Sequence, residues 1–374
     1  MKICIVGGIF LKGGTRSSYI KSTPETILED GLRAAGHEVT TLSHYDDVDY
    51  SRFVLIHVHH LSYGALRLAA DPGGKPFLFT LHDGSYMMGI PPTRYHSATL
   101  RYINNRADAI ISLSNGEADH QRKYFPGHPT IPSVVIPNGI SSVLYPFAAR
   151  NPQPHTPWKL LFCAQLLPIK NADILIKAVA QLKHPVELSL AYQTALLEPE
   201  LKLLAASLGI ADRVHFLGKV DPAELAALHK THDLFVLPSS TEALPSVITE
   251  CMYSGLPFIA TPVGGVPEQT NGFGHLLQKR TPEDLAAAIH HVFNNYSEYV
   301  AKSQAMSNHA RAMYSISSMI ERHIDLYEQV ASKPPVRSKG GLLNFAVRTA
   351  VRQRGTRGPG KAAAWAHLPQ GATK

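Results

Sequence analysis

With 374 residues, 44% of them hydrophobic and 17% charged, the chain is long enough for two globular domains and is neither fibrous nor largely disordered. Its apolar runs are all shorter than the ~20 residues of a membrane-spanning helix, and the apolar block 1–8 predicts a buried first strand rather than a signal peptide. The three cysteines are odd in number and scattered, which favours reduced thiols and a cytoplasmic protein.

The net charge of +7 is concentrated in the C-terminal segment 333–374. Nine of the 36 Lys and Arg residues lie there, whereas all 29 acidic residues precede it, so the remaining chain is close to neutral. Over 340–354, apolar and basic residues alternate at helical spacing, a pattern typical of a helix that lies on an anionic membrane surface. The alternative is a disordered, solvated tail, and the Gly- and Ala-rich end beyond Gly358 favours disorder there.

The first half of the chain alternates predicted strands and helices, which favours a parallel, doubly wound sheet. We expect strands at 2–6, 38–42, 53–58, 76–81, 109–113 and 134–136, and helices at 24–35, 61–70 and 115–125.

A Pro-rich stretch at 151–157 has the composition of a linker, and a second alternating set follows it. The fold class is therefore predicted to be α/β, with two doubly wound, Rossmann-like domains that face each other across a cleft between the carboxyl ends of their strands. In the second set we expect strands at 158–163, 186–190, 214–217, 234–237 and 257–260, and helices at 172–182, 196–208, 222–229, 245–254, 282–293 and 297–330.

Twenty histidines are scattered along the chain without a paired metal-ligand spacing. His57, His59 and His60 are close in sequence, but such a cluster more often marks a strand end and its loop. We therefore expect no metal site and no cofactor.

The segment 239–261 predicts a strand end, an acidic turn, a helix, a glycine cap and a buried strand. Pro245 suits the first turn of the helix, and Gly255 is placed to end it. Glu242 and Glu250 then flank a helix start, whose free N–H groups suit a phosphate while the carboxylates accept hydrogen bonds from sugar hydroxyls. The alternative is an ordinary αβ unit with surface glutamates.

Glu242 and Glu250, separated by seven residues and followed by Gly-Leu-Pro at 255–257 and Val-Gly-Gly-Val-Pro-Glu at 263–268, resemble the donor-binding signature of the family 4, or group 1, retaining glycosyltransferases. Enzymes of this family have the two-domain GT-B architecture.

The resemblance implies four regions. Residues 1–150 are expected to form the acceptor-side Rossmann-like domain, and 151–306 the nucleotide-sugar donor side. Residues 307–332 are expected to form a helix that crosses back to the N-terminal domain, and 333–374 a basic, mostly disordered tail.

The resemblance also assigns roles to individual residues. Glu250 matches the acid that binds the ribose hydroxyls, and Glu242 the acid that contacts the transferred sugar. Lys170 matches the lysine that neutralises the leaving diphosphate, although a solvated residue in a first helical turn is the alternative. Backbone amides over the sugar and diphosphate are expected from Ala243, Leu244, Pro245 and Ser246.

One position departs from the family pattern. Where relatives have Gly-Arg after the strand that precedes the lysine, this chain has Ala164-Gln165. Gln165 can donate hydrogen bonds to the donor but brings no charge. Three explanations are open. Lys170 and helix dipoles stabilise the leaving diphosphate sufficiently without the arginine, or another base such as Lys219 replaces it. Alternatively, the protein is a weak or degenerate member of the family.

On the N-terminal side, Gly13 and Gly14 resemble the diglycine loop that approaches the diphosphate. His82 and Asp83 match the strand-end His-Asp pair near the reacting sugar, with a satisfied loop histidine as the alternative. Asn138-Gly139 matches a family landmark that we interpret as a turn.

The implied function is transfer of a sugar from a nucleoside diphosphate sugar, with retention and without a metal, in cell-surface polysaccharide or glycolipid assembly. The expected partners are the donor and a glycan or lipid-linked acceptor, with peripheral contact to an anionic inner membrane face and no nucleic acid. The alternatives are a nucleotide-sugar epimerase of the same architecture and a degenerate protein that binds sugar nucleotides without catalysis.

Overall fold

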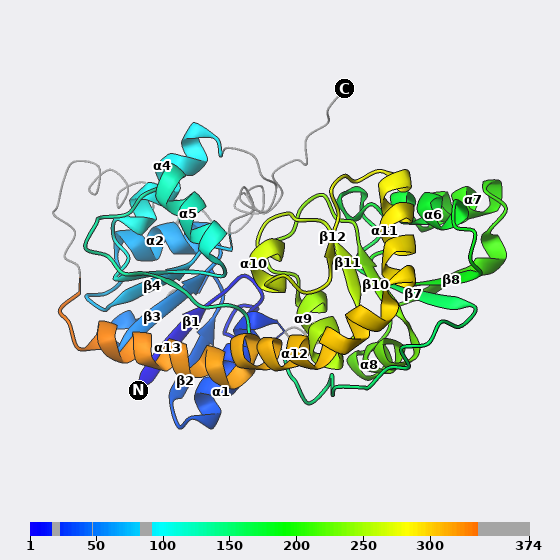
Figure 1. Cartoon of the computed structure of the whole chain (residues 1–374). Coiled ribbons are helices and arrows are strands. Elements are labelled where there is room, and N and C mark those ends of the chain that lie inside the picture. Colours follow the sequence, from blue (N-terminus) through cyan, green and yellow to red (C-terminus); the bar gives the residue numbers. More distant parts are fainter. Residues whose placement is uncertain (17–22, 47, 83–91, 336–374) are drawn as a thin grey trace. The chain divides into compact units, whose positions relative to one another are not determined.

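The computed structural model describes residues 1–16, 23–46, 48–82 and 92–335, and these fold into two compact units. The first unit contains the described residues up to Ile136 together with the segment from Met319 onward, and the second runs from Pro137 to Ser318. Each unit has a parallel sheet between layers of helices (Figure 1). None of the described helices is both long and apolar enough to cross a membrane.

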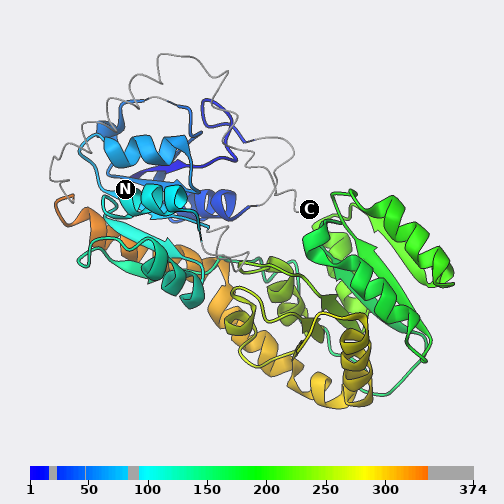
Figure 2. The same ribbon diagram turned by 90° about the horizontal axis from the view of Figure 1, so that it is seen from above.

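The first unit is built on a six-stranded parallel sheet in the order β2-β1-β3-β4-β5-β6. Helices α2, α4 and α5 cover one face of this sheet, and α1 and α13 cover the other (Figure 1, Figure 2). The strands are β1 (Lys2–Val6), β2 (Glu38–Leu42), β3 (Leu55–His59), β4 (Phe77–Thr80), β5 (Ala109–Ser112) and β6 (Ser133–Val135). The helices are α1 (Pro24–Ala34), η1 (Tyr50–Arg52), α2 (Tyr63–Ala70), α4 (Arg94–Asn104), α5 (Asn115–Tyr124) and α13 (Ile316–Ala331).

Helix α1 is defined by its first turn and by its contact with α13. Thr23 and Thr26 form a capping box, and Pro24 occupies the first turn, where its missing N–H costs nothing. A Cβ atom at Gly31 would lie 2.3 Å from Cδ1 of Ile320, so the two helices approach each other closely. This packing joins the end of the described chain to the first sheet.

The second unit is built on a parallel sheet in the order β12-β11-β10-β7-β8-β9. Helices α6, α7 and α11 pack as one layer, and α8, α9 and α12 as the other (Figure 1). The strands are β7 (Trp158–Cys163), β8 (Val186–Ala191), β9 (Val214–Gly218), β10 (Leu234–Leu237), β11 (Phe258–Ala260) and β12 (His275–Leu276). The helices are η2 (Pro168–Lys170), α6 (Ala172–Ala180), α7 (Glu198–Ser207), η3 (Ala211–Arg213), α8 (Pro222–Thr231), α9 (Ser246–Ser254), α10 (Val266–Thr270), α11 (Pro282–Asn294) and α12 (Tyr296–Tyr314).

The α/β fold class with two doubly wound parallel sheets is confirmed, but the single helix expected over 297–330 is wrong. The helix breaks at Ser315, whose backbone is extended and forms a bridge with Ile140. The Ile140 amide donates to the Tyr314 carbonyl at 2.8 Å, and the Ser315 hydroxyl accepts from the Ser318 amide. A distant segment therefore supplies the backbone partners that end α12, and Ser315 caps α13.

The strand orders locate the ligand-binding edge of each sheet. In the first unit the chain turns back between β1 and β3, and in the second between β7 and β10. Doubly wound sheets bind ligands at such a reversal, beside the carboxyl ends of the strands, because neighbouring loops there diverge to opposite faces. The residues that follow β1, β3, β7 and β10 are therefore the first to examine.

Candidate active site

Lys170 and Glu242 meet at the strand-order reversal of the second unit. Lys170 ends η2, which follows β7, and Glu242 lies in the loop that follows β10. The lysine Nζ lies 2.6 Å from Oε1 of Glu242, and the two side chains are only 18% and 9% exposed. The structure thus joins two of the residues that the sequence proposed as catalytic, in an ion pair largely shielded from water.

Backbone contacts hold the lysine loop against the loop of Glu242. Asn171 adopts the left-handed conformation directly after η2, and its Nδ2 donates to the Pro238 carbonyl at 2.8 Å. The Ser240 amide donates to the Ile169 carbonyl at 2.7 Å. The position of the ion pair is therefore set by the backbone and not by the two long side chains alone.

A second loop closes on Glu242 from the other side, and it explains the paired glycines at 264 and 265. Gly264 has φ +55°, and a Cβ atom there would lie 1.7 Å from the Glu242 carbonyl oxygen. The Gly265 amide donates to the Ala243 carbonyl at 2.8 Å. Only glycine fits at 264 because the two backbones are in direct contact.

Helix α9 presents its N-terminus beside Glu242. Pro245 is its N-cap, not a first-turn residue as the sequence suggested, and it makes no side-chain cap. Because Pro245 has no N–H, the amides expected over a ligand reduce to those of Ala243, Leu244 and Ser246. The first amides of a helix have no partner within the helix and carry a partial positive charge, so they suit an anion. Gly255, with φ +73°, ends the helix as expected.

Glu250 lies on α9, partly buried, and Tyr145 hydrogen-bonds to its carboxyl group. Loss of solvation raises the pKa of Glu250 to about 7, although the bond from Tyr145 acts in the opposite direction. Burial, followed by the Glu250 charge, raises the pKa of the tyrosine as well. Sequence reasoning missed Tyr145, which belongs to an irregular segment with no motif of its own.

Gln165 and Lys219, the two residues weighed in connection with the missing arginine, are both exposed. Gln165 lies in the loop after β7, and its carbonyl accepts from the Leu167 amide at 2.8 Å. Lys219 follows β9, and β8 lies between β9 and β7 in the sheet. Of the two, Gln165 follows the strand that leads to Lys170.

In the first unit, the diglycine loop is fixed from within. Gly13 and Gly14 both have positive φ, and the Gly13 amide donates to Oδ1 of Asp46 at 3.0 Å. A Cβ atom at Gly14 would lie 1.9 Å from the Thr41 carbonyl oxygen. Packing against the second strand therefore explains Gly14, and a role of the loop in ligand binding stays a prediction.

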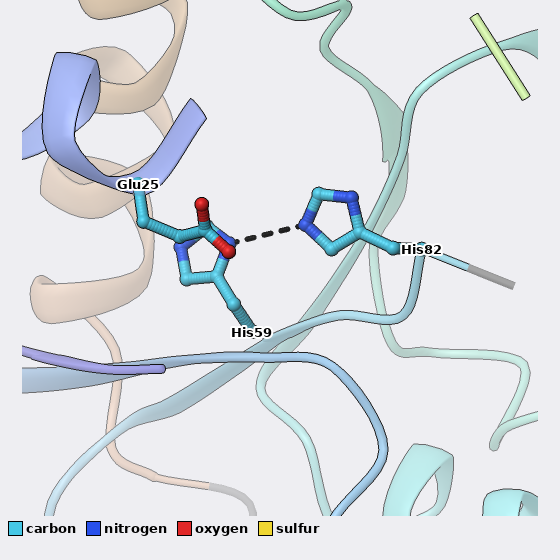
Figure 3. A group of neighbouring side chains, drawn as sticks. All are labelled: Glu25, His59 and His82. Atoms are coloured by element: carbon cyan, nitrogen blue, oxygen red, sulfur yellow. Dashed lines mark hydrogen bonds between the residues drawn. The ribbon is translucent and has the colours of Figure 1, made fainter. Parts of the chain in front are cut away.

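His82 is the second residue after β4 and belongs to a histidine cluster. Its Nε2 lies 3.3 Å from Nδ1 of His59, and its ring stacks on His60 with 4.3 Å between centroids. Nε2 of His60 lies 2.7 Å from Oε1 of Glu25, which comes from the first turn of α1 (Figure 3 shows Glu25, His59 and His82). Asp83 lies outside the described residues.

Burial changes the pKa of several groups in this cluster. Burial lowers the pKa of His59 to about 3 and lowers that of His82 as well. Burial also opposes ionisation of Glu25, but the hydrogen bond from His60 and the nearby histidines outweigh it and lower the pKa of Glu25. Sequence reasoning missed Glu25, because nothing local distinguishes it from an ordinary helix-start acid.

Two family models match this chain. The model of glycosyl transferases group 1 matches residues 147–313, and that of glycosyltransferase family 4 matches residues 47–142. The chain belongs to the group 1 glycosyltransferases.

Curated relatives of this group 1 glycosyltransferase include D-inositol 3-phosphate glycosyltransferases. The protein from Rhodococcus opacus is 27% identical over 285 residues, which are 68% of this chain and 63% of the relative. The protein from Corynebacterium kroppenstedtii is 26% identical over 319 residues, 78% of this chain and 69% of the relative. The chain thus spans just under two thirds of the Rhodococcus relative.

Solved structures support the GT-B fold. Sucrose-phosphate synthase from Thermosynechococcus elongatus matches 89% of this chain and all of its own, with a TM-score of 0.71 and 18% identity. Anabaena HepE, solved in complex with UDP and glucose, matches 88% of this chain and all of its own, with a TM-score of 0.67 and 19% identity.

The two family models divide the candidate residues of this group 1 glycosyltransferase. Lys170, Glu242 and Glu250 lie in the region matched by the group 1 model, and His82 in that matched by the family 4 model. Glu25 lies in neither matched region, so the family models assign it nothing.

Proposed function

We propose that this group 1 glycosyltransferase transfers a sugar from a nucleoside diphosphate sugar to a glycan or lipid-linked acceptor, with retention at the anomeric carbon. The observation that carries the proposal is the shielded Lys170–Glu242 pair beside the start of α9. A lysine in this position neutralises the charge that grows on the leaving diphosphate, and the partner carboxylate keeps it oriented until the donor arrives.

The donor is held from two sides in this proposal. The uncapped start of α9 binds the diphosphate, and the Glu250 carboxylate accepts hydrogen bonds from the two ribose hydroxyls. Glu242 accepts from hydroxyls of the transferred sugar once the donor displaces its contact with Lys170. HepE, with its bound UDP and glucose, supports a nucleotide-sugar donor for proteins of this fold.

The reaction breaks the bond between the anomeric carbon and the diphosphate oxygen and forms a bond from the same carbon to the acceptor oxygen. In same-face transfer the acceptor proton passes to the departing phosphate, so no protein base is needed at the anomeric carbon. The protein contributes position and charge. Transfer is then expected to proceed without added Mg²⁺ or Mn²⁺.

We further propose, from sequence alone, an acceptor at an anionic membrane surface on the cytoplasmic side, in cell-surface polysaccharide or glycolipid assembly. The amphipathic stretch 340–354 and all other tail residues after Pro335 lie outside the described residues. A chain ending at Pro335 should lose sedimentation with anionic vesicles at low salt and keep its fold. Full-length protein that stays in the supernatant would exclude this contact.

The decisive experiment screens UDP-, GDP- and ADP-sugars for thermal stabilisation and then measures transfer with the donor that binds. Glu250→Gln should weaken binding of both the nucleoside diphosphate and the sugar nucleotide. Glu242→Ala should spare the bare diphosphate and reduce transfer. Variants that both turn over like the wild type would refute the site.

The products separate the remaining functions. Slow hydrolysis of the donor without an acceptor is expected of a transferase. Interconversion of free nucleotide sugars would identify an epimerase. Binding of the donor without either reaction would identify a degenerate protein.

A further inference from the structure

The histidine cluster of the first unit contains an arrangement that neither the sequence nor the family models assign. One ligand atom from each of Glu25, His59 and His82 lies within 4.8 Å of the ligand atoms of the other two. The three side chains come from the first turn of α1, the end of β3 and the loop after β4, and Figure 3 shows them converging. They meet at the carboxyl ends of the strands, the edge where a doubly wound sheet binds ligands.

The separation of the two imidazole nitrogens matches the spacing of two ligands on one ion. Nδ1 of His59 and Nε2 of His82 lie 3.3 Å apart. Two ligands of a tetrahedral ion with bonds of about 2.05 Å are separated by about 3.3 Å. In the structure the same two nitrogens form a hydrogen bond, drawn as a dashed line in Figure 3, which is long compared with the usual 2.7–3.2 Å, roughly, of such bonds.

His59 provides a second observation. Its side chain is 3% exposed, and among the described residues its Nε2 has no hydrogen-bond partner. A buried polar atom without a partner costs free energy, and native structures seldom leave one without a reason. Either ring nitrogen can ligate a metal, and binding through Nε2 in place of Nδ1 would give that buried atom the contact it lacks.

The surroundings are arranged as they are around metal ligands. Nε2 of His60 contacts the Glu25 carboxylate at 2.7 Å, which orients it toward the other two side chains. His60 and His82 both have positive φ, at 65° and 51°, a conformation that non-glycine residues hold mainly where their surroundings require it. Neighbours that orient a ligating carboxylate are a regular part of metal sites.

We propose that Glu25, His59 and His82 form a binding site for a divalent transition ion of the zinc type. Two imidazoles and one carboxylate are a frequent zinc donor set, whereas Mg²⁺ prefers oxygen ligands. The fourth position is open to water or to an oxygen of a bound ligand. An ion on Nε2 of His82 fixes the remaining ring proton on Nδ1, so this histidine becomes a hydrogen-bond donor. The proposal does not rest on the proposed function.

The test is a calorimetric titration of chelator-treated full-length protein with Zn²⁺, without donor or acceptor. We expect one ion per chain, a rise in melting temperature with Zn²⁺ but not with Mg²⁺, and the visible absorption of a tetrahedral ion when Co²⁺ replaces zinc. Glu25→Gln and His82→Asn should each weaken Zn²⁺ binding about tenfold or more. Asparagine tolerates the positive φ at position 82, so this variant remains testable if Glu25→Gln does not fold.

The matched control is the double variant His275→Gln, His291→Gln in the second unit. The centroids of these two rings lie 5.3 Å apart. Among the described residues, the two histidines do not belong to a group of three side chains that could hold a metal ion. The control should bind Zn²⁺ like the wild type. Absence of stoichiometric binding to the wild type would overturn the proposal, as would Glu25→Gln and His82→Asn binding zinc as tightly as the control.

Discussion

The two units share a parallel doubly wound sheet but equip its ligand-binding edge with opposite chemistry. In the second unit a cation and an anion, Lys170 and Glu242, pair at 2.6 Å where the strand order reverses. In the first unit the corresponding edge gathers imidazole rings around one carboxylate, Glu25. In the second unit, a charged ligand can therefore replace the contact between Lys170 and Glu242. In the first unit, the nitrogen and oxygen lone pairs can accept a proton, a hydrogen bond from a hydroxyl group or a metal ion.

The difference shows that the fold alone does not determine the chemistry of its edge. Both sheets place loops at the same kind of reversal, yet the residues that follow each strand decide what is bound. Substitutions in the second unit should therefore act on charge and donor binding, and leave zinc binding to the first unit unchanged.

The largest expected effect is that of Lys170→Ala on transfer. Removing a preorganised group that stabilises developing charge lowers turnover by about 10²–10³-fold. Lys177→Ala is the matched control. Lys177 pairs with Asp173 on α6, and both side chains are exposed. Turnover measured at saturating donor should fall only in the first variant. Equal activity of the two variants would place Lys170 outside the reaction.

Gly264→Ala tests whether backbone contact holds the ion pair in place. A Cβ atom there would collide with the Glu242 carbonyl oxygen, so the loop of Glu242 must move. We expect a loss of about 3 kcal/mol in the free energy of unfolding, from backbone strain and the collision together.

The control is Gly272→Ala. Gly272 also has a positive φ, of +81°, but a Cβ atom added there would have no neighbouring atom within 4 Å. It should cost only the left-handed strain of about 1–2 kcal/mol. The midpoints of urea unfolding compare the two, and equal losses would show that the contact with Glu242 is unimportant.

The pH dependence of donor binding separates the two edges further. Burial raises the pKa of Glu250 to about 7, so the stability it contributes is present below its unfolded pKa and is lost as pH rises through 7. Ribose binding needs the carboxylate, so donor affinity should instead fall as pH decreases, by about tenfold from pH 8 to 6.

The measurement uses the sugar nucleotide, whose esterified diphosphate does not titrate in this range. Glu250→Gln should bind weakly and with little pH dependence. A wild-type affinity that stays constant from pH 8 to 6 would contradict the proposed role of Glu250.

Sequence was sufficient for the strands of both sheets except β12, and it missed helix α4. It was also sufficient for the residues that a short-range sequence pattern connects. The strands at 158–163 and 234–237, the Gly255 cap and the motif around Glu242 follow from apolar runs and turn residues. The break at Ser315 was not predictable, because its partner Ile140 lies far away in the chain.

The site shows the same limit. Glu25, His59 and His82 share no spacing, and only the parallel register of β1, β3 and β4 brings their loops together. Tyr145 likewise reaches Glu250 through tertiary packing. Residues whose roles depend on such contacts carry no local signal, whereas Lys170 was found because a family pattern marks it.

The smallest expected effect is that of Gln165→Arg, which restores the arginine usual in the family. An added cation near the diphosphate should tighten nucleoside diphosphate binding. Position 165 is exposed, however, so water and salt screen the charge of the introduced arginine. Exposed charge pairs contribute about 0.2–1 kcal/mol, so we expect at most a fivefold lower Kd at low salt and less at high salt. Gln304→Arg on exposed α12 adds the same charge elsewhere in the second unit and should leave Kd unchanged. If both variants tighten binding equally, the effect is a long-range attraction between the added positive charge and the diphosphate, and Gln165 does not face the donor. If only Gln165→Arg tightens binding, a charge at position 165 acts directly on the bound diphosphate.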